Sequence, residues 1–412
     1  MVRRIHDFLL AILRNKRVQR FLVLVLLKPL MTIFTMLAYL PMKLFPINNR
    51  RLLFMSFQGR GYNCNPRYIF EGVCDEFGDD YEYVWVINNA RLIPEDYRKK
   101  VKTVKYGSFT FFYYLATSKY WVMNTHFLPE IKPRKGQVYL QTWHAAGAFK
   151  KFGLHNPVYD ESVKKRYVKD ASHFTYLLCS SGEVKSIFAS ALELDEEKIV
   201  VTGLPRNDIL FKNEKTRCEH IKKCLREEYG VDTTCKIILY APTFRDLKNE
   251  DHLHLDVSLM REKLKNRFVL FIRFHPGLSS NIGCVLEREH RGFCYNLSAY
   301  PDVQELLLIT DILVTDYSSV IFDFAILGRP ILFYPYDLQE YERSIRGFYW
   351  DYETFVPGPI CFSTDELIDR ILTVERWHDP EKIVSFAKRF NTPFDGNATR
   401  RVMELLGFRK HY

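Results

Sequence analysis

Short apolar runs alternate with longer amphipathic or polar stretches from residue 51 onward. Strands of a parallel sheet are apolar throughout because helices cover both faces, whereas those helices are apolar on one side only. The alternation therefore predicts an α/β layer fold. Six predicted strands come first, at residues 52–57, 83–87, 120–124, 138–142, 176–180 and 199–203. Five more follow, at residues 236–241, 268–274, 293–296, 312–315 and 331–334.

A charged, helix-prone stretch at residues 213–230 separates the two series of strands. Two series imply two sheets, with the boundary between them near residues 211–232. We therefore expect three regions along the chain. They are a basic and hydrophobic segment at 1–48, a first Rossmann-like domain at 49–215, and a second Rossmann-like domain at 216–412.

The N-terminal segment combines arginines with an apolar stretch at residues 21–45, which Lys28, Pro29, Pro41 and Lys43 interrupt. Neither half alone reaches the roughly 20 apolar residues that a spanning helix needs. Three structures remain open: an interfacial or re-entrant anchor, a signal-anchor helix, and a helix docked on the first domain. Basic flanks suit an anionic cytoplasmic leaflet, so we expect a membrane-associating helical segment.

Ligands of parallel α/β sheets bind beyond the carboxyl ends of the strands, so the residues after each apolar run are the candidates for a site. Small residues and a histidine follow the run at 138–142, and small residues let a ligand approach the backbone closely. This turn consists of Trp143, His144, Ala145, Ala146 and Gly147. A histidine there serves either as a general base or as a structural residue.

Residues 310–337 are typical of strand, polar turn, short helix and second strand. Ser318 and Ser319 then lie at the start of the helix, where free N–H groups favour phosphate oxygens. Asp323 lies one turn further along and could accept hydrogen bonds from polyol or ribose hydroxyls. The alternative is that both serines only cap the helix and Asp323 is solvated.

Three further strand-terminal turns carry an arginine. They contain Arg206, then Thr243 with Arg245, then Arg273 followed by His275. Each turn alone is a common surface feature, but their occurrence at successive strand ends favours phosphate binding.

The chain of 412 residues carries a net charge of +10, which favours anionic partners. Its basic residues are dispersed and no nucleic-acid-binding motif is present, so we expect no nucleic-acid partner. Nine scattered cysteines without a C-x-x-C pair indicate a reducing compartment and no structural zinc. No metal is predicted, although Asp316 with Asp323 could hold Mg²⁺.

The motifs WH, LPRND, APTFRD, RFHP and TDYSSVIFDF, in that order, resemble the CDP-glycerol glycerophosphotransferase family of teichoic acid primases and polymerases. The resemblance implies a GT-B-like arrangement, with two Rossmann-like domains facing a cleft, at the cytoplasmic face of the bacterial membrane. It also implies transfer of glycerol phosphate, or a related alditol phosphate, from CDP-glycerol or CDP-ribitol. CMP would leave, and the acceptor would be lipid-linked or polymeric.

Position by position, the resemblance makes His144 the base that deprotonates the acceptor hydroxyl. His275 is expected at the donor pyrophosphate, where it orients that group or protonates the leaving CMP. The remaining residues of the motifs would bind the donor: Arg206 and Arg273 at phosphates, Thr243 and Arg245 along the site, Ser318 and Ser319 at the pyrophosphate, and Asp323 at the hydroxyls.

The turn at 143–147 departs from the family, which often has Gly-Thr-Pro after the histidine where this chain has Ala145, Ala146 and Gly147. The departure bears on which alditol or acceptor is used, and the reaction class is unaffected.

Two other functions remain open. A GT-B glycosyltransferase would share the fold but move a sugar from a nucleotide sugar, and a non-catalytic protein could bind polyanions at the membrane surface. The nucleotide that is released distinguishes the first of these. The sequence leaves open the number of units added and the oligomeric state.

Overall fold

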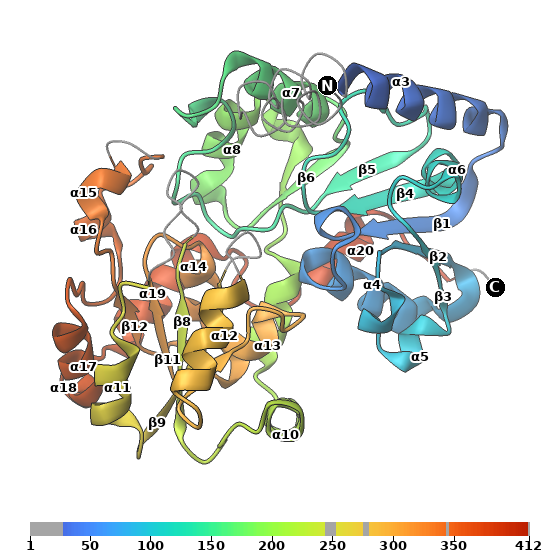
Figure 1. Ribbon diagram of the computed structural model, residues 1–412. Coiled ribbons are helices and arrows are strands. Elements are labelled where there is room, and N and C mark those ends of the chain that lie inside the picture. The colour runs from blue at the N-terminus through green and yellow to red at the C-terminus, as the bar shows by residue number, and fades with distance from the viewer. Residues whose placement is uncertain (1–27, 244–252, 275–279, 343–345, 411–412) are drawn as a thin grey trace, which may run out of the picture.

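Two parallel sheets form the framework of the protein (Figure 1). The computed structural model describes residues 28–243, 253–274, 280–342 and 346–410. The first sheet has the order β3-β2-β1-β4-β5-β6-β7 and the second the order β10-β9-β8-β11-β12. The strands of the first sheet are β1 (Asn48–Met55), β2 (Glu82–Val86), β3 (Val101–Val104), β4 (Ser118–Met123), β5 (Val138–Gln141), β6 (Tyr176–Cys179) and β7 (Ile199–Val201). Those of the second are β8 (Lys236–Ala241), β9 (Phe268–Ile272), β10 (Cys294–Asn296), β11 (Ile312–Thr315) and β12 (Ile331–Phe333).

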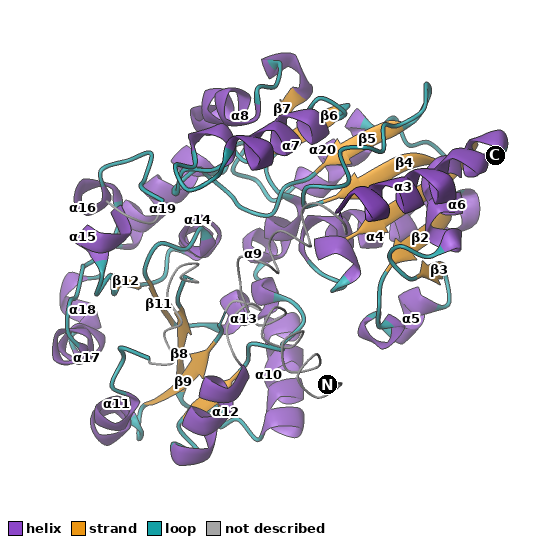
Figure 2. Cartoon of the chain, turned by 45° about the horizontal axis from the view of Figure 1, so that its top comes forward, coloured by secondary structure: helices purple, strands orange, loops and turns teal. Residues whose placement is uncertain are grey.

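Helices flank both sheets (Figure 2), as the continuous apolar strands require. In β9, for example, every residue is buried. The helices before the second sheet are α3 (Lys28–Tyr39), α4 (Cys64–Phe77), α5 (Glu95–Arg98), α6 (Phe109–Thr117), α7 (Glu161–Ala171), α8 (Lys185–Leu192), α9 (Asp208–Lys212) and α10 (Lys215–Tyr229). The later ones are α11 (Val257–Leu264), α12 (Ser280–Glu289), α13 (Val303–Ile309), α14 (Val320–Phe324), α15 (Leu338–Glu340), α16 (Tyr352–Phe355), α17 (Thr364–Leu372), α18 (Val374–Trp377), α19 (Pro380–Phe390) and α20 (Ala398–Leu405).

The predicted α/β fold with two sheets is confirmed, and each of the eleven predicted runs overlaps a strand. One strand, β3, was not predicted. It lies at the edge of the first sheet, and its two central residues, Lys102 and Thr103, are exposed. A four-residue edge strand with a polar centre has no continuous apolar run to mark it.

Strand order reverses direction between β1 and β4 in the first sheet and between β8 and β11 in the second. Such a switch point opens a crevice at the carboxyl ends of the strands. The turns that the sequence singled out follow β5, β8 and β11, so the fold carries them to these two edges.

The C-terminal helix α20 returns to the first sheet, although residues 398–408 fall in the range predicted for the second domain (Figure 1). It packs against α4. The side chains of Val402, Met403 and Phe408 are buried in the same core cluster as Phe54 of β1. The chain therefore crosses between the two sheets twice.

The described N-terminus begins with α3, which packs against α6. Thr35, Ala38 and Tyr39 form the buried side of this helix. Residues 1–27, which hold much of the predicted membrane-associating segment, lie outside the described residues. Within the described ranges, every helix is too short or too polar to cross a bilayer.

Candidate active site

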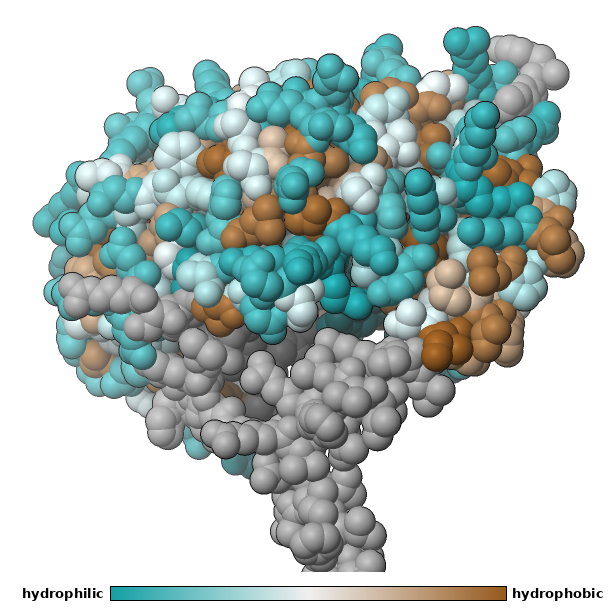
Figure 3. Space-filling model, turned by 90° about the horizontal axis from the view of Figure 1, so that it is seen from above, coloured by the Kyte–Doolittle hydropathy of each residue, from teal (hydrophilic) through white to brown (hydrophobic). Residues whose placement is uncertain are grey.

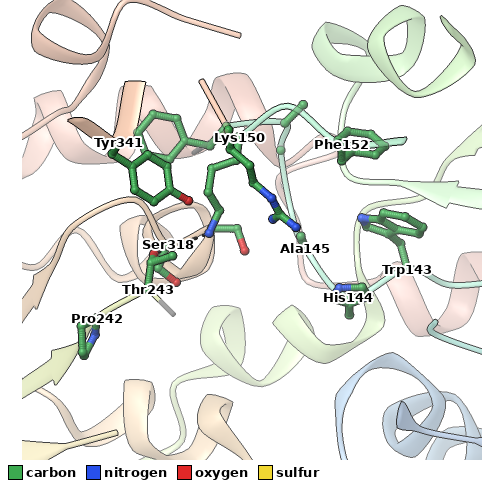
Figure 4. Close-up of a pocket in the computed structure, with 14 residues that line it drawn as sticks. Trp143, His144, Ala145, Lys150, Phe152, Pro242, Thr243, Ser318 and Tyr341 are labelled. Atoms are coloured by element: carbon green, nitrogen blue, oxygen red, sulfur yellow. Dashed lines mark hydrogen bonds between the residues drawn. The ribbon is translucent and has the colours of Figure 1, made fainter. Parts of the chain in front are cut away.

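A pocket of about 380 Å³ lies where the carboxyl-end turns of the two sheets meet (Figure 4). His144 and Trp143, after β5, lie on one side, whereas Thr243, after β8, and Ser318, after β11, lie on the other. Lys150 extends between them toward Thr243, with 3.5 Å from its Nζ to the threonine Oγ1. The residues lining the pocket are Trp143, His144, Ala145, Gly147, Ala148, Phe149, Lys150, Phe152, Pro242, Thr243, Ser318, Ser319, Tyr341 and Arg346.

The proton of neutral His144 is fixed on Nδ1. This nitrogen lies 2.7 Å from the carbonyl oxygen of Asn124, and a carbonyl can only accept a hydrogen bond. Nε2 therefore carries the lone pair, which is the form that a general base requires. The Asn124 side chain accepts in turn from the Phe57 N–H at 2.9 Å, so the switch point of the first sheet supports the imidazole.

Aromatic rings hold the His144 ring in place. The Trp143 ring stacks on it, with centroids 5.2 Å apart, and Phe57 meets it edge-on at 5.7 Å. Trp143 has a left-handed backbone with φ of 54°. Asn65 stabilises that turn because its Nδ2 donates to the carbonyls of Thr142 and Trp143.

Gly147 lets the His144 loop pass directly over α14. Its φ is +65°, and an added Cβ would lie 2.5 Å from the ring of Phe322. The Gly147 N–H donates to Ser180 Oγ at 3.0 Å. Of its two alanine neighbours, Ala145 lines the pocket whereas Ala146 is fully buried. The loop therefore requires glycine at position 147. This glycine ends the stretch in which the chain has Ala145, Ala146 and Gly147 in place of the family's Gly-Thr-Pro.

The second half of the loop pairs with a segment of the second domain. Lys150 forms an antiparallel bridge with Phe348, and the Lys151 N–H donates to the Gly347 carbonyl at 3.2 Å. The Trp350 indole donates to the Ala148 carbonyl at 2.6 Å. Hydrogen bonds to its main chain thus attach the His144 loop to the segment that precedes α16.

Asp316 ties together the two turns on the second sheet. It is fully buried, and its Oδ1 accepts from the Thr243 N–H at 2.8 Å. Ser319 is the first flanking residue of α14, and the Ser318 Oγ accepts weakly from the Val320 N–H at 3.4 Å. Both serines and Thr243 line the same pocket as His144.

Sequence reasoning did not include Lys150, Phe152, Tyr341 or Arg346 among the site residues, although all four line the pocket. Lys150 stands six residues after His144 in the same turn, which was a usable signal. Tyr341 directly follows α15 and Arg346 lies five residues further on, where the sequence carries no motif, so only the fold brings them to the pocket.

Arg206 and Asp323 lie beside the pocket, and neither lines it. They form a buried ion pair at 2.6 Å, which links the turn after β7 to α14. Burial alone would lower the pKa of the Arg206 guanidinium, but the Asp323 carboxylate raises it above its ordinary value. The Arg206 guanidinium is therefore held in its charged form beside Asp323.

Arg273 also turns away from the pocket. Its guanidinium donates to the carbonyls of Leu297 and Tyr300 at 3.0 and 2.7 Å. Burial lowers the pKa of this arginine. The predicted residues Arg245 and His275 lie outside the described residues. Within the described part of the chain, no three His, Cys, Asp or Glu side chains are grouped to hold a metal ion.

Comparison with known proteins places the chain in a family. Residues 37–407 match the family model "CDP-Glycerol:Poly(glycerophosphate) glycerophosphotransferase". A teichoic acid poly(glycerol phosphate) polymerase of Bacillus spizizenii is 37% identical over 379 residues, covering 88% of this chain and 94% of the relative. A teichoic acid poly(ribitol-phosphate) polymerase of the same organism is 30% identical, covering 90% of this chain and 58% of the relative.

Solved structures of a member of the same family resemble this chain. The wall teichoic acid polymerase TagF matches with a TM-score of 0.80 and 28% identity, covering 95% of this chain and 97% of that chain. A histidine-to-asparagine variant of TagF soaked with CDPG matches with a TM-score of 0.81 and 29% identity, covering 91% and 92%. The family match spans both sheets and every turn that forms the pocket. This chain therefore belongs to the CDP-glycerol:poly(glycerophosphate) glycerophosphotransferase family and is a transferase.

Proposed function

We propose that this protein transfers glycerol phosphate from CDP-glycerol to a hydroxyl of a lipid-linked or polymeric acceptor, releasing CMP, in teichoic acid synthesis. One observation carries the proposal: His144, with its proton fixed on Nδ1, shares a pocket with Thr243, Ser318 and Ser319 of the other domain. A base and a set of phosphate-binding hydroxyls on facing walls are what attack of a hydroxyl on a phosphoryl group requires. The match to the poly(glycerol phosphate) polymerase favours glycerol as the alditol.

The reaction divides between the walls. His144 Nε2 removes the proton of the acceptor hydroxyl. The hydroxyl oxygen attacks the phosphorus that carries glycerol, and the bond from that phosphorus to the CMP oxygen breaks. Ser318, Ser319 and Thr243 hold the pyrophosphate by hydrogen bonds. Lys150 and Arg346, which line the same pocket, neutralise charge that develops on the phosphate oxygens.

The resemblance to the family adds two residues to the part of the site that would bind the donor. His275 orients the pyrophosphate or protonates the leaving CMP, and Arg245 extends the donor site from the turn after Thr243. The two domains act as a GT-B-like pair, with the donor on the second sheet and the acceptor hydroxyl beside the first. Support comes from the two parallel sheets and from the pocket that residues of both line.

The test is nucleotide release by purified protein with CDP-glycerol or CDP-ribitol in separate reactions, with bacterial membranes as acceptor. We expect CMP with CDP-glycerol. CMP with CDP-ribitol alone would overturn the choice of alditol and leave the reaction class standing. No CMP with either donor, together with a nucleoside diphosphate released from a nucleotide sugar, would replace the proposal with glycosyl transfer.

We further propose that the outer face of α3 and the turn after it rests on the cytoplasmic surface of the membrane. Several large apolar side chains there are exposed, including Leu37 at 67% and Leu44 at 88%. Hydrophobic side chains gather at the right-hand edge of the view from above, the side on which α3 lies in Figure 1 (Figure 3). This apolar face comprises Ile33, Phe34, Leu37, Leu40, Leu44, Phe45 and Phe109.

Basic groups border the apolar face. The Lys43 ammonium lies over the Tyr39 ring at 5.1 Å, and Arg134 donates to the Phe45 carbonyl at 2.7 Å. An amphipathic surface with basic edges suits the headgroup region of a bilayer that contains anionic lipid. Membrane contact there would hold the enzyme where a lipid-linked acceptor lies.

The double substitution Leu37→Glu and Leu44→Glu is expected to weaken binding to phosphatidylglycerol vesicles at least tenfold, because each buried leucine contributes about 1.5–3 kcal/mol. Vesicle co-sedimentation measures this. Phe362→Glu is the matched control, since Phe362 is 55% exposed but lies in the second domain. Equal vesicle binding by the double variant and the control would show that the apolar face does not contact the membrane.

A further inference from the structure

Arg206 connects the two domains through a single guanidinium. Its Nη1 donates to the main-chain carbonyl of His144 at 2.6 Å, and its Nη2 donates to Asp323 Oδ2 at 2.6 Å. Asp323 belongs to α14, directly after the serine pair that lines the pocket. One side chain therefore spans from the base on the first domain to the helix that follows the phosphate-binding turn on the second.

Both oxygens of Asp323 are engaged within the protein. Asn207 Nδ2 donates to Oδ1 at 2.9 Å, while Arg206 binds Oδ2. The Asp323 carboxylate is 2% exposed and Arg206 is 5% exposed. A substrate hydroxyl could reach this carboxylate only if the packing around the buried ion pair opened, and exposing or separating such a pair is strongly unfavourable.

Arg206 also supports the main chain around His144 through Asn65. The Arg206 N–H donates to Asn65 Oδ1 at 3.1 Å, and the Asn65 amide donates to the carbonyls of Thr142 and Trp143. Asn65 of α4 and Arg206 of the turn after β7 together bind three consecutive carbonyls, those of Thr142, Trp143 and His144. The imidazole is joined to this main chain through its own Cα, so a shift of the main chain moves the ring.

We propose that Arg206 and Asp323 are positioning residues, which set His144 in register with the donor turn of the opposite domain and do not bind the donor. The inference rests on the proposed function, because it assumes that His144 is the base. General base catalysis needs the accepting nitrogen within hydrogen-bond reach of the hydroxyl, and a displacement of about 1 Å can lower the rate about a hundredfold.

The key variant is Arg206→Lys, which keeps a positive charge near Asp323 but cannot bridge two acceptors with a planar fork. We expect kcat for CMP release to fall about thirtyfold to a hundredfold. The dissociation constant for CDP-glycerol, measured by calorimetry without acceptor, should stay within about twofold of the parent value. Asp323→Asn, which keeps the shape of the side chain, should show the same split if Arg206→Lys folds poorly.

Arg67→Lys is the matched control. Arg67 is also a buried arginine between the domains, where it pairs with Asp302 at 3.2 Å and Glu305 at 2.9 Å, but its described contacts do not include His144. Its kcat should stay close to that of the parent. Loss of CDP-glycerol affinity in Arg206→Lys would overturn the inference in favour of a phosphate contact. An equal loss of kcat in Arg67→Lys would overturn it in favour of general domain docking.

A second readout does not depend on the donor. In spectra of isotope-labelled histidine, the Nδ1–H signal of His144 should shift in Arg206→Lys and stay in place in Arg67→Lys. The reason is that Arg206 donates to the His144 carbonyl, whereas the described ion pairs of Arg67 are to other residues. An unshifted signal in Arg206→Lys would contradict the positioning role. Absence of CMP release by the parent protein would instead contradict the proposed function, and this comparison would still decide the role of Arg206.

Discussion

Replacement of His144 by alanine is expected to lower kcat for CMP release by about two to four powers of ten, the usual share of a general base. The reason is geometric. The Asn124 carbonyl fixes the proton on Nδ1 at 2.7 Å, so Nε2 is the basic atom of a ring that lines the pocket. Alanine removes this lone pair while leaving the loop main chain, which Arg206 and Asn65 hold, in place.

The measurement is the initial rate of CMP release with CDP-glycerol and bacterial membranes, and binding of CDP-glycerol should change little. His220→Ala is a suitable control because His220 is an exposed histidine on α10, remote in sequence from the pocket turns. Turnover by His144→Ala at the parent rate would remove His144 as the base.

The second large effect is expected from Gly147→Ala. A Cβ there would lie 2.5 to 2.7 Å from three ring atoms of Phe322. That ring cannot move aside, because it is fully buried and packs against Phe386 and Phe390, with centroid distances of 5.6 and 5.0 Å. The His144 loop must shift instead. We expect kcat to fall about a hundredfold, as for a base displaced by about 1 Å.

A control separates the clash from backbone strain. Gly230 has φ of +66°, almost the same as the +65° of Gly147, but an added Cβ at Gly230 would meet nothing within 4 Å. Both alanine variants carry the left-handed penalty of roughly 1–2 kcal/mol. Only Gly147→Ala adds overpacking, typically about 1–3 kcal/mol. Equal melting temperatures and equal kcat values for the two variants would rule out the clash.

The fold could be predicted because the apolar runs that mark its strands are local features of the sequence. Central strands such as β8 and β9 are apolar over most of their length, and their spacing by helical stretches defines the α/β class. The edge strand β3 lacked that signal. The same local logic brought Trp143, Thr243 and Ser318 to one pocket, because the carboxyl ends of parallel strands face the same way.

The partners of Arg206 and Asp323 could not be predicted. They lie 117 residues apart in the chain, and their contact exists only once the two domains dock. An arginine after a strand and an aspartate on a short helix look the same in sequence whether they face a ligand or each other. Arg346 was missed for the related reason that it follows α15 without a motif of its own, and only the folded chain brings it to the pocket.

The return of α20 to the first sheet has a consequence for synthesis of the protein. The core that contains Phe54 of β1 also contains Val402, Met403 and Phe408. A nascent chain therefore cannot complete this core until the ribosome has added the whole second domain. At about 5–20 residues per second, the roughly 200 residues after β7 take on the order of 10–40 seconds. During that interval the apolar side chains around Phe54 that α20 later covers stay exposed.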